Sequence, residues 1–248
     1  MLSGWYDIES ASISSTYGAT NSSPGTQDAQ QTTLGQLASS EIWKELDALT
    51  SDNPAGLNLF CQYGVVTELY FLERGLVKLM RTEENGREII VGLRSPGALL
   101  GLAAAIAARP HPFAAVTVTR CRLVRLAARE FIDLLSRDRG LSACVREVLS
   151  AEVLEQAERI SQIVALPARY RLEQLLWELY RTTTADRESH GRLQLPLRHA
   201  ETAQLLAITP AYLSNLFREL EREQILRRAK GWIVITKPER LRHPDLED

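Results

Sequence analysis

The chain has few cysteines, no long apolar run and little net charge, and each of these shortages excludes some classes of protein. Its 248 residues include three cysteines, Cys61, Cys121 and Cys144, whose odd number and wide spacing fit neither a disulfide framework nor a zinc site. No apolar run approaches the length of a membrane span. The first basic residue is Lys44, so the N-terminus resembles neither a signal nor a transit peptide. We therefore expect a cytoplasmic protein without membrane contact, metal or cofactor, whose cysteines serve as small core residues.

The sequence also lacks the residue groupings on which enzymes depend. Its four histidines are scattered over polar segments, and we find no nucleophile paired with a base and no glycine-rich phosphate loop. We therefore expect no catalytic residues. The formal net charge of −2 means that any surface for nucleic acid must be local, because the whole chain is not basic.

The two ends of the chain are polar. Residues 1–38 are rich in Ser, Thr, Gly and Gln and bury little, so we expect a disordered tail there. The segment Ser39–Leu49 has the pattern of a short capped amphipathic helix. Residues 241–248 are expected to form a second tail.

Between Leu57 and Leu126 the sequence has the pattern of short strands separated by turns. Asn85-Gly86 stands between two apolar runs, and Asn-Gly is the strongest short signal for a β-hairpin. Many short strands with Gly and Pro turns are typical of a small barrel or jelly roll. We therefore predict an α+β protein in which residues 39–138 form a double-stranded β-helix, or jelly-roll, domain.

A long helix should follow over residues 139–166, where Leu166-Pro167 ends it. Four apolar residues in this helix repeat at four-three-four spacing, which is the pattern of a coiled-coil seam. We interpret the seam as a dimer interface, and the alternative is a helix that packs only on its own barrel. The interface residues would be Val153, Ala157, Ile160 and Val164.

The stretch from His199 to Trp232 predicts a helix-turn-helix followed by a β-hairpin wing. Thr209 is a good N-cap and Pro210 fits the first helical position, so a second helix should start there and cross the first steeply. Its outward face is small and polar, which suits the DNA major groove, and the wing has a basic tip that suits phosphates. The alternative is a helical hairpin used only for packing. Within residues 167–240 the predicted DNA contacts are Thr209, Pro210, Ala211, Tyr212, Ser214, Asn215, Arg218, Arg228 and Lys230.

The chain resembles the bacterial Crp–Fnr superfamily of transcription regulators over about residues 40–240. The resemblance rests on the run from Leu69 to Leu79, on Gly86-Arg87-Glu88, on Pro96-Gly97 with Gly101 beyond it, and on the winged helix. It implies a homodimer that binds a two-fold symmetric operator, with a cyclic-nucleotide-binding-like sensor domain and a C-terminal DNA-reading domain.

The sequence departs from the family pattern where relatives bind cyclic AMP. Those relatives carry Gly-Glu after the Pro-Gly turn and then an Arg-Ser or Arg-Thr pair. Here Leu102 follows Gly101, and the later pair falls at Pro112-Phe113, with Arg109 the nearest cation. A buried phosphate without a matched cation is costly, so we expect no control by cyclic AMP. The residues that would line an effector pocket are Gly101, Leu102, Arg109, Pro112 and Phe113.

Other family features are missing too. No cysteine precedes Cys61, so an Fnr-type iron–sulfur centre is not expected, and His111 in its Pro-flanked loop is interpreted as a surface residue. The Glu and Arg that many relatives carry on the recognition helix are replaced here, where Ala211 and Asn215 stand on either side of a matching Ser214. The target sequence should therefore differ from the usual family half-site.

Two functions from different classes remain. The first is a sequence-specific DNA-binding transcription regulator, with double-stranded DNA, a second copy of the chain, RNA polymerase and an unidentified small-molecule effector as its candidate partners. The second is a ligand-binding or protein-interaction module whose winged helix no longer reads DNA. The basic residues near the presumed groove face favour the first, and they include Arg218, Arg222, Arg227, Arg228 and Lys230.

Overall fold

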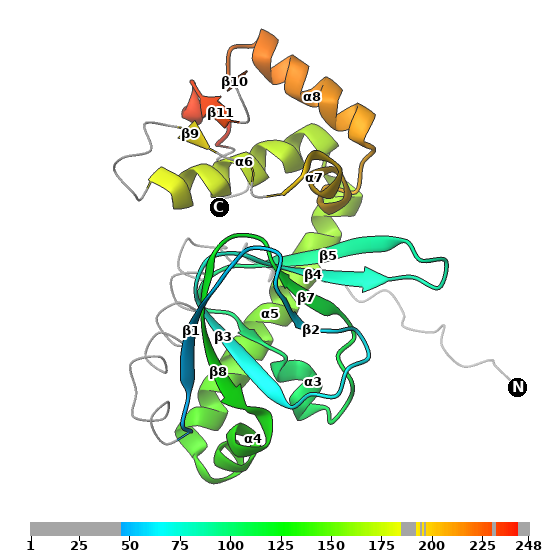
Figure 1. Cartoon of the computed structure of the whole chain (residues 1–248). Coiled ribbons are helices and arrows are strands. Elements are labelled where there is room, and N and C mark those ends of the chain that lie inside the picture. Colours follow the sequence, from blue (N-terminus) through cyan, green and yellow to red (C-terminus); the bar gives the residue numbers. More distant parts are fainter. Residues whose placement is uncertain (1–45, 185–191, 194, 196, 230–231, 243–248) are drawn as a thin grey trace, which may run out of the picture.

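The protein consists of a β-barrel domain, a long helix beside it, and a smaller C-terminal domain at the far end of that helix (Figure 1). This computed structural model describes residues 46–184, 192–193, 195, 197–229 and 232–242. The predicted N-terminal tail lies outside these residues, as does most of the predicted C-terminal tail. Leu241 is buried in the C-terminal core, so that domain extends past the predicted boundary at residue 240.

The barrel is built from two four-stranded antiparallel sheets. One sheet has the order β1 (Leu49–Asn53), β8 (Cys121–Ala127), β3 (Glu68–Arg74) and β6 (Leu99–Leu100). The other has the order β2 (Asn58–Phe60), β7 (Ala114–Thr117), β4 (Val77–Thr82) and β5 (Glu88–Arg94). This arrangement confirms the predicted jelly roll and, with the helices, the α+β class.

Strand β3 shows how the sequence builds two cores. Successive side chains on a strand point to opposite faces, so Leu69 and Phe71 lie on one face and Leu72 on the other. Leu69 and Phe71 join a cluster with Phe131 and other helical residues outside the barrel. Leu72 joins the cluster inside it, where Cys121 is fully buried. The expectation of core cysteines is confirmed for Cys121 but wrong for Cys61, which is exposed.

Two glycine turns set the strand connections of the barrel. Gly86 has φ of 78° and donates its N–H to the carbonyl of Glu83 at 2.9 Å, which confirms the predicted hairpin between β4 and β5. Gly75 has φ of 99°, and a Cβ there would lie 2.6 Å from the carbonyl oxygen of Arg120. Only glycine fits at position 75, because the positive φ disfavours other residues and the neighbouring backbone leaves no room for a Cβ atom.

The predicted helix Ser39–Leu49 is wrong at its C-terminal end. Residues 39–45 lie outside the described part of the chain, but Leu46 and Asp47 form a turn and Leu49 opens strand β1. Asp47 has φ of 44°, which no right-handed helix contains. Strand β1 instead pairs with β8, with Leu49 opposite Arg125, and the ladder to β8 replaces the helical hydrogen bonds.

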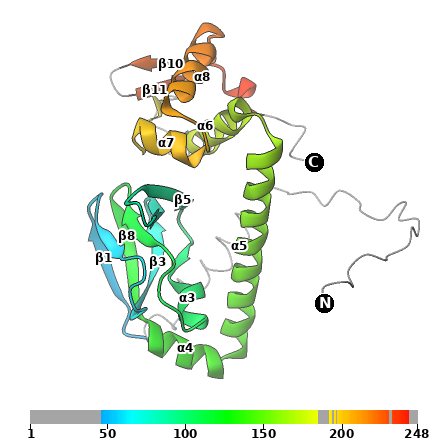
Figure 2. The same cartoon turned by 90° about the vertical axis from the view of Figure 1, so that its right-hand side faces the viewer.

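Three helices follow the barrel strands or lie between them: α3 (Leu102–Ile106), α4 (Ala128–Arg137) and α5 (Arg139–Ala165). Asp138 caps α5 by accepting hydrogen bonds from the N–H groups of Gly140 and Leu141, at 2.8 and 3.0 Å. The 27 residues of α5 run along the barrel from α4 to the C-terminal domain (Figure 2). Neither α5 nor any other helix in the described ranges is both long and apolar enough to cross a membrane.

The C-terminal domain contains α6 (Ala168–Thr184), β9 (Arg192–Leu193), α7 (His199–Leu205), α8 (Pro210–Arg222), β10 (Leu226–Ala229), β11 (Trp232–Ile235) and the short 3-10 helix η1 (Pro238–Arg240). Its core joins α6 to α8 and the hairpin through Leu172, Leu176, Leu213, Leu216 and Phe217. Leu226 pairs with Ile235 in the antiparallel hairpin, which confirms the predicted wing. The domain lies over the β4–β5 side of the barrel, with α7 against β5 (Figures 1 and 2).

Candidate nucleic-acid interface

The turn between α7 and α8 fixes the direction of the second helix. Ala207 takes φ of 53°, and Ile208 donates its N–H to the carbonyl of Ala203 at 3.0 Å, which closes the end of α7. The left-handed conformation costs a non-glycine residue about 1 kcal/mol, which the buried neighbours must offset. Thr209 then caps α8, because its hydroxyl accepts a hydrogen bond from the N–H of Tyr212 at 3.2 Å, and Pro210 is the first helical residue.

A second contact holds the turn against the long helix. The guanidinium of Arg171 donates to the carbonyl of Leu166 at 2.6 Å, after the end of α5, and to that of Leu206 at 2.8 Å, after the end of α7. The last carbonyls of a helix have no partner within it and carry partial negative charge, so a cation there is favourable. Arg171 therefore fixes the orientation of the helix-turn-helix relative to α5.

Helix α8 divides cleanly into a buried and an exposed face. Leu213, Leu216, Phe217 and Leu220 are at most 2 % exposed and anchor the helix in the domain core. The predicted DNA contacts lie on the opposite side: Thr209, Pro210, Ala211, Tyr212, Asn215 and Arg218 are exposed and Ser214 is half-buried. The structure thus brings seven of the nine predicted contacts onto one surface.

Two of these side chains are held by neighbours. Arg218 donates from Nη2 to Oδ1 of Asn215 at 2.6 Å. The ring of His199 in α7 lies 3.0 Å from Oγ of Ser214 and 3.1 Å from the carbonyl oxygen of Pro210. The Oδ1 atom of Asn215 keeps a second lone pair and its amide nitrogen has two N–H groups, so the Arg218 contact orients Asn215 without occupying all of its hydrogen-bonding atoms.

The wing carries the remaining predicted contacts. Arg228 donates from Nε and Nη2 to the carboxylate of Glu221 at 3.1 and 2.8 Å, and its guanidinium lies 5.3 Å from the ring centre of Phe217. This pairing raises the pKa of Arg228 and lowers that of Glu221. Arg227 next to it is exposed, whereas Lys230 lies outside the described residues.

Neither His199 nor Glu221 is among the contacts predicted for this surface. His199 starts α7 and touches the second helix only because the two helices cross. Glu221 could have been suspected, because a carboxylate near the end of a helix is a natural partner for a nearby basic wing. No local pattern indicates the contact between His199 and Ser214.

The predicted effector residues do not gather around one hollow. Arg109 lines an open, mostly apolar hollow of about 490 Å³ between α3 and α4, together with Ala104, Ala105 and Ile132. Leu102 is 3 % exposed and belongs to the cluster outside the barrel. The other three lie apart from this hollow: Gly101 precedes α3, Phe113 packs on the inner cluster, and Pro112 is exposed.

The prediction that His111 lies on the surface is wrong. Its side chain is 2 % exposed and stacks on Phe60, with ring centres 3.8 Å apart and planes 8° apart. A Cβ on Gly101 would lie 3.2 Å from its ring, and Gly101 itself has φ of 87°. Burial lowers the pKa of His111, so the neutral ring is favoured. The polar, Pro-flanked loop predicts an exposed histidine. The burial of His111 comes from its stacking on Phe60, a tertiary contact that the local sequence does not show.

The predicted seam residues of α5 face away from the barrel. In the single chain the exposed fractions are 67 % for Val153, 64 % for Ile160 and 82 % for Val164, and Ala157 is exposed too. Leu154 extends this apolar surface at 70 % exposure. In the alternative arrangement, a helix packed only on its own barrel, these residues would stay in contact with water.

Comparison with known proteins agrees with both domains. The family model of the cyclic nucleotide-binding domain matches residues 51–138, and that of the Crp-like helix-turn-helix domain matches residues 170–243. The two models together match more than half of the chain, in the order of the two folded parts.

Two curated regulators and one solved structure show the same likeness. The nitrogen fixation regulation protein FixK of Rhizobium meliloti is 25 % identical over 75 % of this chain and 82 % of its own length. The global nitrogen regulator of Synechocystis is 25 % identical over 68 % of this chain and 76 % of its own length. The structure of FixK2 from Bradyrhizobium japonicum shares the fold, with a TM-score of 0.64 at 19 % identity over 80 % of this chain and 96 % of that one. With both family models matched in order, the chain belongs to the Crp–Fnr superfamily of bacterial transcription regulators.

Proposed function

We propose that this protein is a sequence-specific DNA-binding transcription regulator that binds a two-fold symmetric operator as a homodimer and is not controlled by cyclic AMP. The exposed polar face of α8 carries the proposal. It presents Tyr212, Asn215 and Arg218 on a helix whose other face is anchored in the core. A helix with small and polar outward residues can enter the major groove, where amide and guanidinium groups match base edges.

The homodimer is supported by the exposed apolar stripe of α5. Val153, Ile160 and Val164 lose contact with water only if a second surface covers them, and burying them is favourable by about 25 cal/mol per Å². A second copy of α5 offers the same stripe, so a two-fold axis would pair like with like. Such a pair would present two copies of α8, and DNA half-sites about one helical turn apart would suit them.

Independence from cyclic AMP is supported by the chemistry beside α3. Leu102 offers no acceptor for a ribose hydroxyl, and Pro112-Phe113 offers no cation for a phosphate. Arg109 lies at the hollow outside the barrel, while the interior beside Gly101 holds the stacked rings of His111 and Phe60. A cyclic phosphate placed there would lose water without gaining a charged partner.

The competing function is a ligand-binding or protein-interaction module that does not read DNA. Two observations favour it: Arg218 already bonds Asn215, and Arg228 already bonds Glu221. Both contacts are exposed, so exchanging them for DNA contacts costs little. As a regulator, the protein would work in the cytoplasm, with RNA polymerase as a candidate partner.

Selection of binding sites from a random pool of duplex DNA tests the proposal. The full chain should enrich an inverted repeat, and its affinity should fall steeply as salt rises, because phosphate contacts release counterions. Arg227→Glu, which reverses an exposed charge on the wing, should weaken binding to every sequence. Absence of any enriched repeat, together with no gel shift at low salt, would favour the module that does not read DNA.

A further inference from the structure

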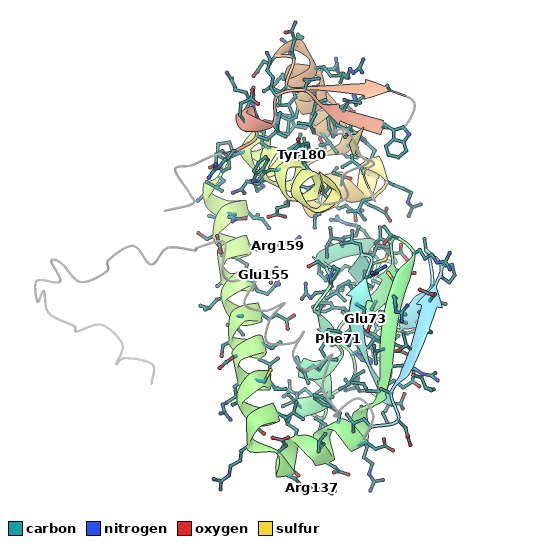
Figure 3. The ribbon with its side chains drawn as sticks, turned by 90° about the vertical axis from the view of Figure 1, so that its left-hand side faces the viewer. Phe71, Glu73, Arg137, Glu155, Arg159 and Tyr180 are labelled. Atoms are coloured by element: carbon teal, nitrogen blue, oxygen red, sulfur yellow. The ribbon has the colours of Figure 1, made fainter. Side chains whose placement is uncertain are left out.

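The ring of His199 bridges the two helices of the helix-turn-helix. His199 is the first residue of α7, and Pro210 and Ser214 belong to α8, so the contact joins two elements that cross. Both helices belong to the C-terminal domain, which lies at the far end of α5 (Figure 3). His199 is exposed, and Ser214 is half-buried beside the exposed Asn215. The ring therefore contacts the surface that we propose to read DNA.

Three polar atoms meet at this contact. Nε2 of His199 lies 3.0 Å from Oγ of Ser214 and 3.1 Å from the carbonyl oxygen of Pro210. Oγ of Ser214 in turn donates to the same carbonyl oxygen at 3.0 Å. Each pair among the three atoms is thus within hydrogen-bond distance. The positions of two protons, on the imidazole and on the hydroxyl, decide which atom donates to which.

The carbonyl oxygen of Pro210 determines where the imidazole proton lies. A carbonyl oxygen can only accept, so the ring nitrogen 3.1 Å away must carry a proton for the contact to be favourable. The neutral ring with its proton on Nε2 meets this condition, and so does the doubly protonated ring. A proton on Nδ1 alone would place a nitrogen lone pair against the carbonyl oxygen. Nε2 of His199 is therefore the donor to Pro210 and Ser214.

The hydroxyl of Ser214 then has one bonding site left. A serine hydroxyl has one proton and two lone pairs. The carbonyl of Pro210 takes the proton, and Nε2 of His199 donates to one lone pair. The second lone pair remains for an outside partner. In this arrangement Ser214 can accept a hydrogen bond from DNA, but it cannot donate one.

His199 keeps the serine in this arrangement. Without the ring, the Ser214 side chain is free to turn to another staggered rotamer, in which its hydroxyl can donate outward. With the ring in place, an outward hydroxyl proton would leave lone pairs of Ser214 and Pro210 facing each other across 3.0 Å. The ring itself lies beside Phe217, with ring centres 6.2 Å apart, and Phe217 is anchored in the domain core. The core thus helps to orient the ring, and the ring orients the hydroxyl.

We propose that His199 is a positioning residue for base recognition, which makes Ser214 an acceptor only and so directs it to a DNA base that carries an amino group. In the major groove the amino donors are N6 of adenine and N4 of cytosine, whereas guanine and thymine present the carbonyl oxygens O6 and O4. A phosphate oxygen has no proton to offer, so Ser214 does not bond the DNA backbone in this state. The inference rests on the proposed function, because it concerns how the same surface reads DNA.

The competing interpretation is that the contact only stabilises the crossing of α7 and α8. Loss of the ring would then lower the free energy of unfolding, or weaken binding to all sequences alike. The order in which bases are preferred would not change. The decisive measurement is therefore base preference at one position, and the stability of the variants serves as a check on their folding.

Selection of binding sites from random duplex DNA by the full chain, followed by titration of single duplexes, provides the test. Ser214→Ala first identifies the base pair that Ser214 reads, because the preference there should be lost. At that position the wild type should prefer adenine over guanine, or cytosine over thymine, by about three- to tenfold, as expected for one hydrogen bond. His199→Leu should reduce this preference to less than about twofold and leave the preferences at other positions in place.

Three further variants separate the donor from the rest of the ring. His199→Gln places an amide N–H at a similar reach along the side chain and should keep most of the preference. Gln204→Leu removes another exposed polar side chain of α7 and should leave the preference unchanged. If His199→Leu does not fold, His199→Asn replaces it, because the shorter amide does not reach Ser214 and the preference should again be lost.

Nuclear magnetic resonance of the imidazole nitrogens tests the proton position without DNA. In alkaline buffer, where imidazole rings are neutral, the proton of His199 should lie on Nε2, and a proton on Nδ1 overturns the proposal. The proposal is also overturned by a wild-type preference for guanine or thymine at the Ser214 position, by an unchanged consensus in Ser214→Ala, or by an unchanged preference in His199→Leu. These results leave sequence-specific binding intact. Failure of the wild type to enrich any sequence would instead contradict the proposed function, and this inference with it.

Discussion

Lys78 of strand β4 donates a hydrogen bond to Oε1 of Glu201 in helix α7 at 2.5 Å, and the two side chains are 12 % and 13 % exposed. Glu201 also accepts hydrogen bonds from the backbone N–H and the guanidinium of Arg198, both at 2.9 Å. One carboxylate thus closes the first turn of α7 and joins the helix-turn-helix domain to the barrel.

Removing the lysine should loosen the two domains. Lys78→Met keeps much of the apolar stem but leaves Glu201 with Arg198, which is 81 % exposed, as its main charged partner. We expect a loss of about 1–3 kcal/mol in the free energy of unfolding, because a hydrogen bond between charged groups is lost at a largely buried site. Denaturant titration of the wild type and of Lys78→Met measures this loss of unfolding free energy.

The matched control is Arg81→Met in the same strand. Arg81 pairs with Glu83 at 3.0 Å, but the side chains are 48 % and 38 % exposed, so the change should be at most about 1 kcal/mol. Equal losses in the two variants would mean that the Lys78 contact adds nothing to an ordinary surface pair.

The same carboxylate should make stability depend on pH in the acid range. Hydrogen bonds from Arg198, and then from Lys78, lower the pKa of Glu201 from 4.5 to about 2. Because the folded pKa lies below the unfolded one, the contribution is complete above pH 4.5 and is lost as the pH falls towards 2. Unfolding curves of the wild type and Glu201→Gln at several pH values should converge in that interval. Curves that stay parallel would contradict the assignment.

Assembly should depend on the exposed stripe of α5. Ile160→Glu introduces a charge at a position where the native side chain is 64 % exposed in the single chain, so each protomer should still fold. In a dimer the charge would be poorly solvated, and the protein should become monomeric and lose operator binding together. Light scattering reports the mass, with Glu158→Gln as a control on a neighbouring exposed position. A variant that remains dimeric would exclude this stripe from the interface.

Replacing Asn215 and replacing Arg227 should have different effects on DNA binding. Asn215 lies on the exposed face of α8 and its amide matches the N6 and N7 pattern of adenine, so Asn215→Ala should cost about 1–3 kcal/mol per half-site and relax one base preference. Arg227→Ala should weaken all sequences alike and reduce the salt slope by about one phosphate contact. Sites selected by wild type and Asn215→Ala would reveal the difference. An identical consensus would mean that Asn215 reads no base.

Cyclic nucleotides should not bind. Neither Leu102 nor the Pro112-Phe113 pair supplies a ribose or phosphate partner, and His111 stacks on Phe60 beside Gly101. Calorimetry with cyclic AMP and cyclic GMP should show no dissociation constant below about 1 mM. A dissociation constant of about 1 mM corresponds to a binding free energy of about −4 kcal/mol. Micromolar affinity would require a pocket that these residues do not form.

The parts of the fold with strong local signals could be predicted from the sequence. Asn85-Gly86 marks the β4–β5 hairpin, and Thr209-Pro210 marks the start of α8 to the residue. In both places the backbone conformation depends on a few adjacent residues, so the pattern carries the information. Strand β1 gave no such signal, because four of its five residues are polar and four are exposed, and among the described strands it pairs with β8 alone.

The contacts between distant residues could not be predicted. His111 is buried by Phe60, and Glu201 is paired with a lysine 123 positions away. Neither residue differs locally from a surface residue of its type. The face of α8 could be assigned because helical periodicity fixes it, but its hydrogen bonds to His199 and within the wing depend on how elements pack.

The two faces of α5 restrict how this helix can change during evolution. Glu152 and Arg159 meet the barrel, while Val153, Ile160 and Val164 face away from it, and the two sets interleave within about three turns. Inserting one residue would rotate everything beyond it by about 100° and would separate both faces from their surfaces. Seven inserted residues would come within about 20° of the original phase. Relatives should therefore differ in α5 by substitution, and length changes should be rare unless they add whole heptads.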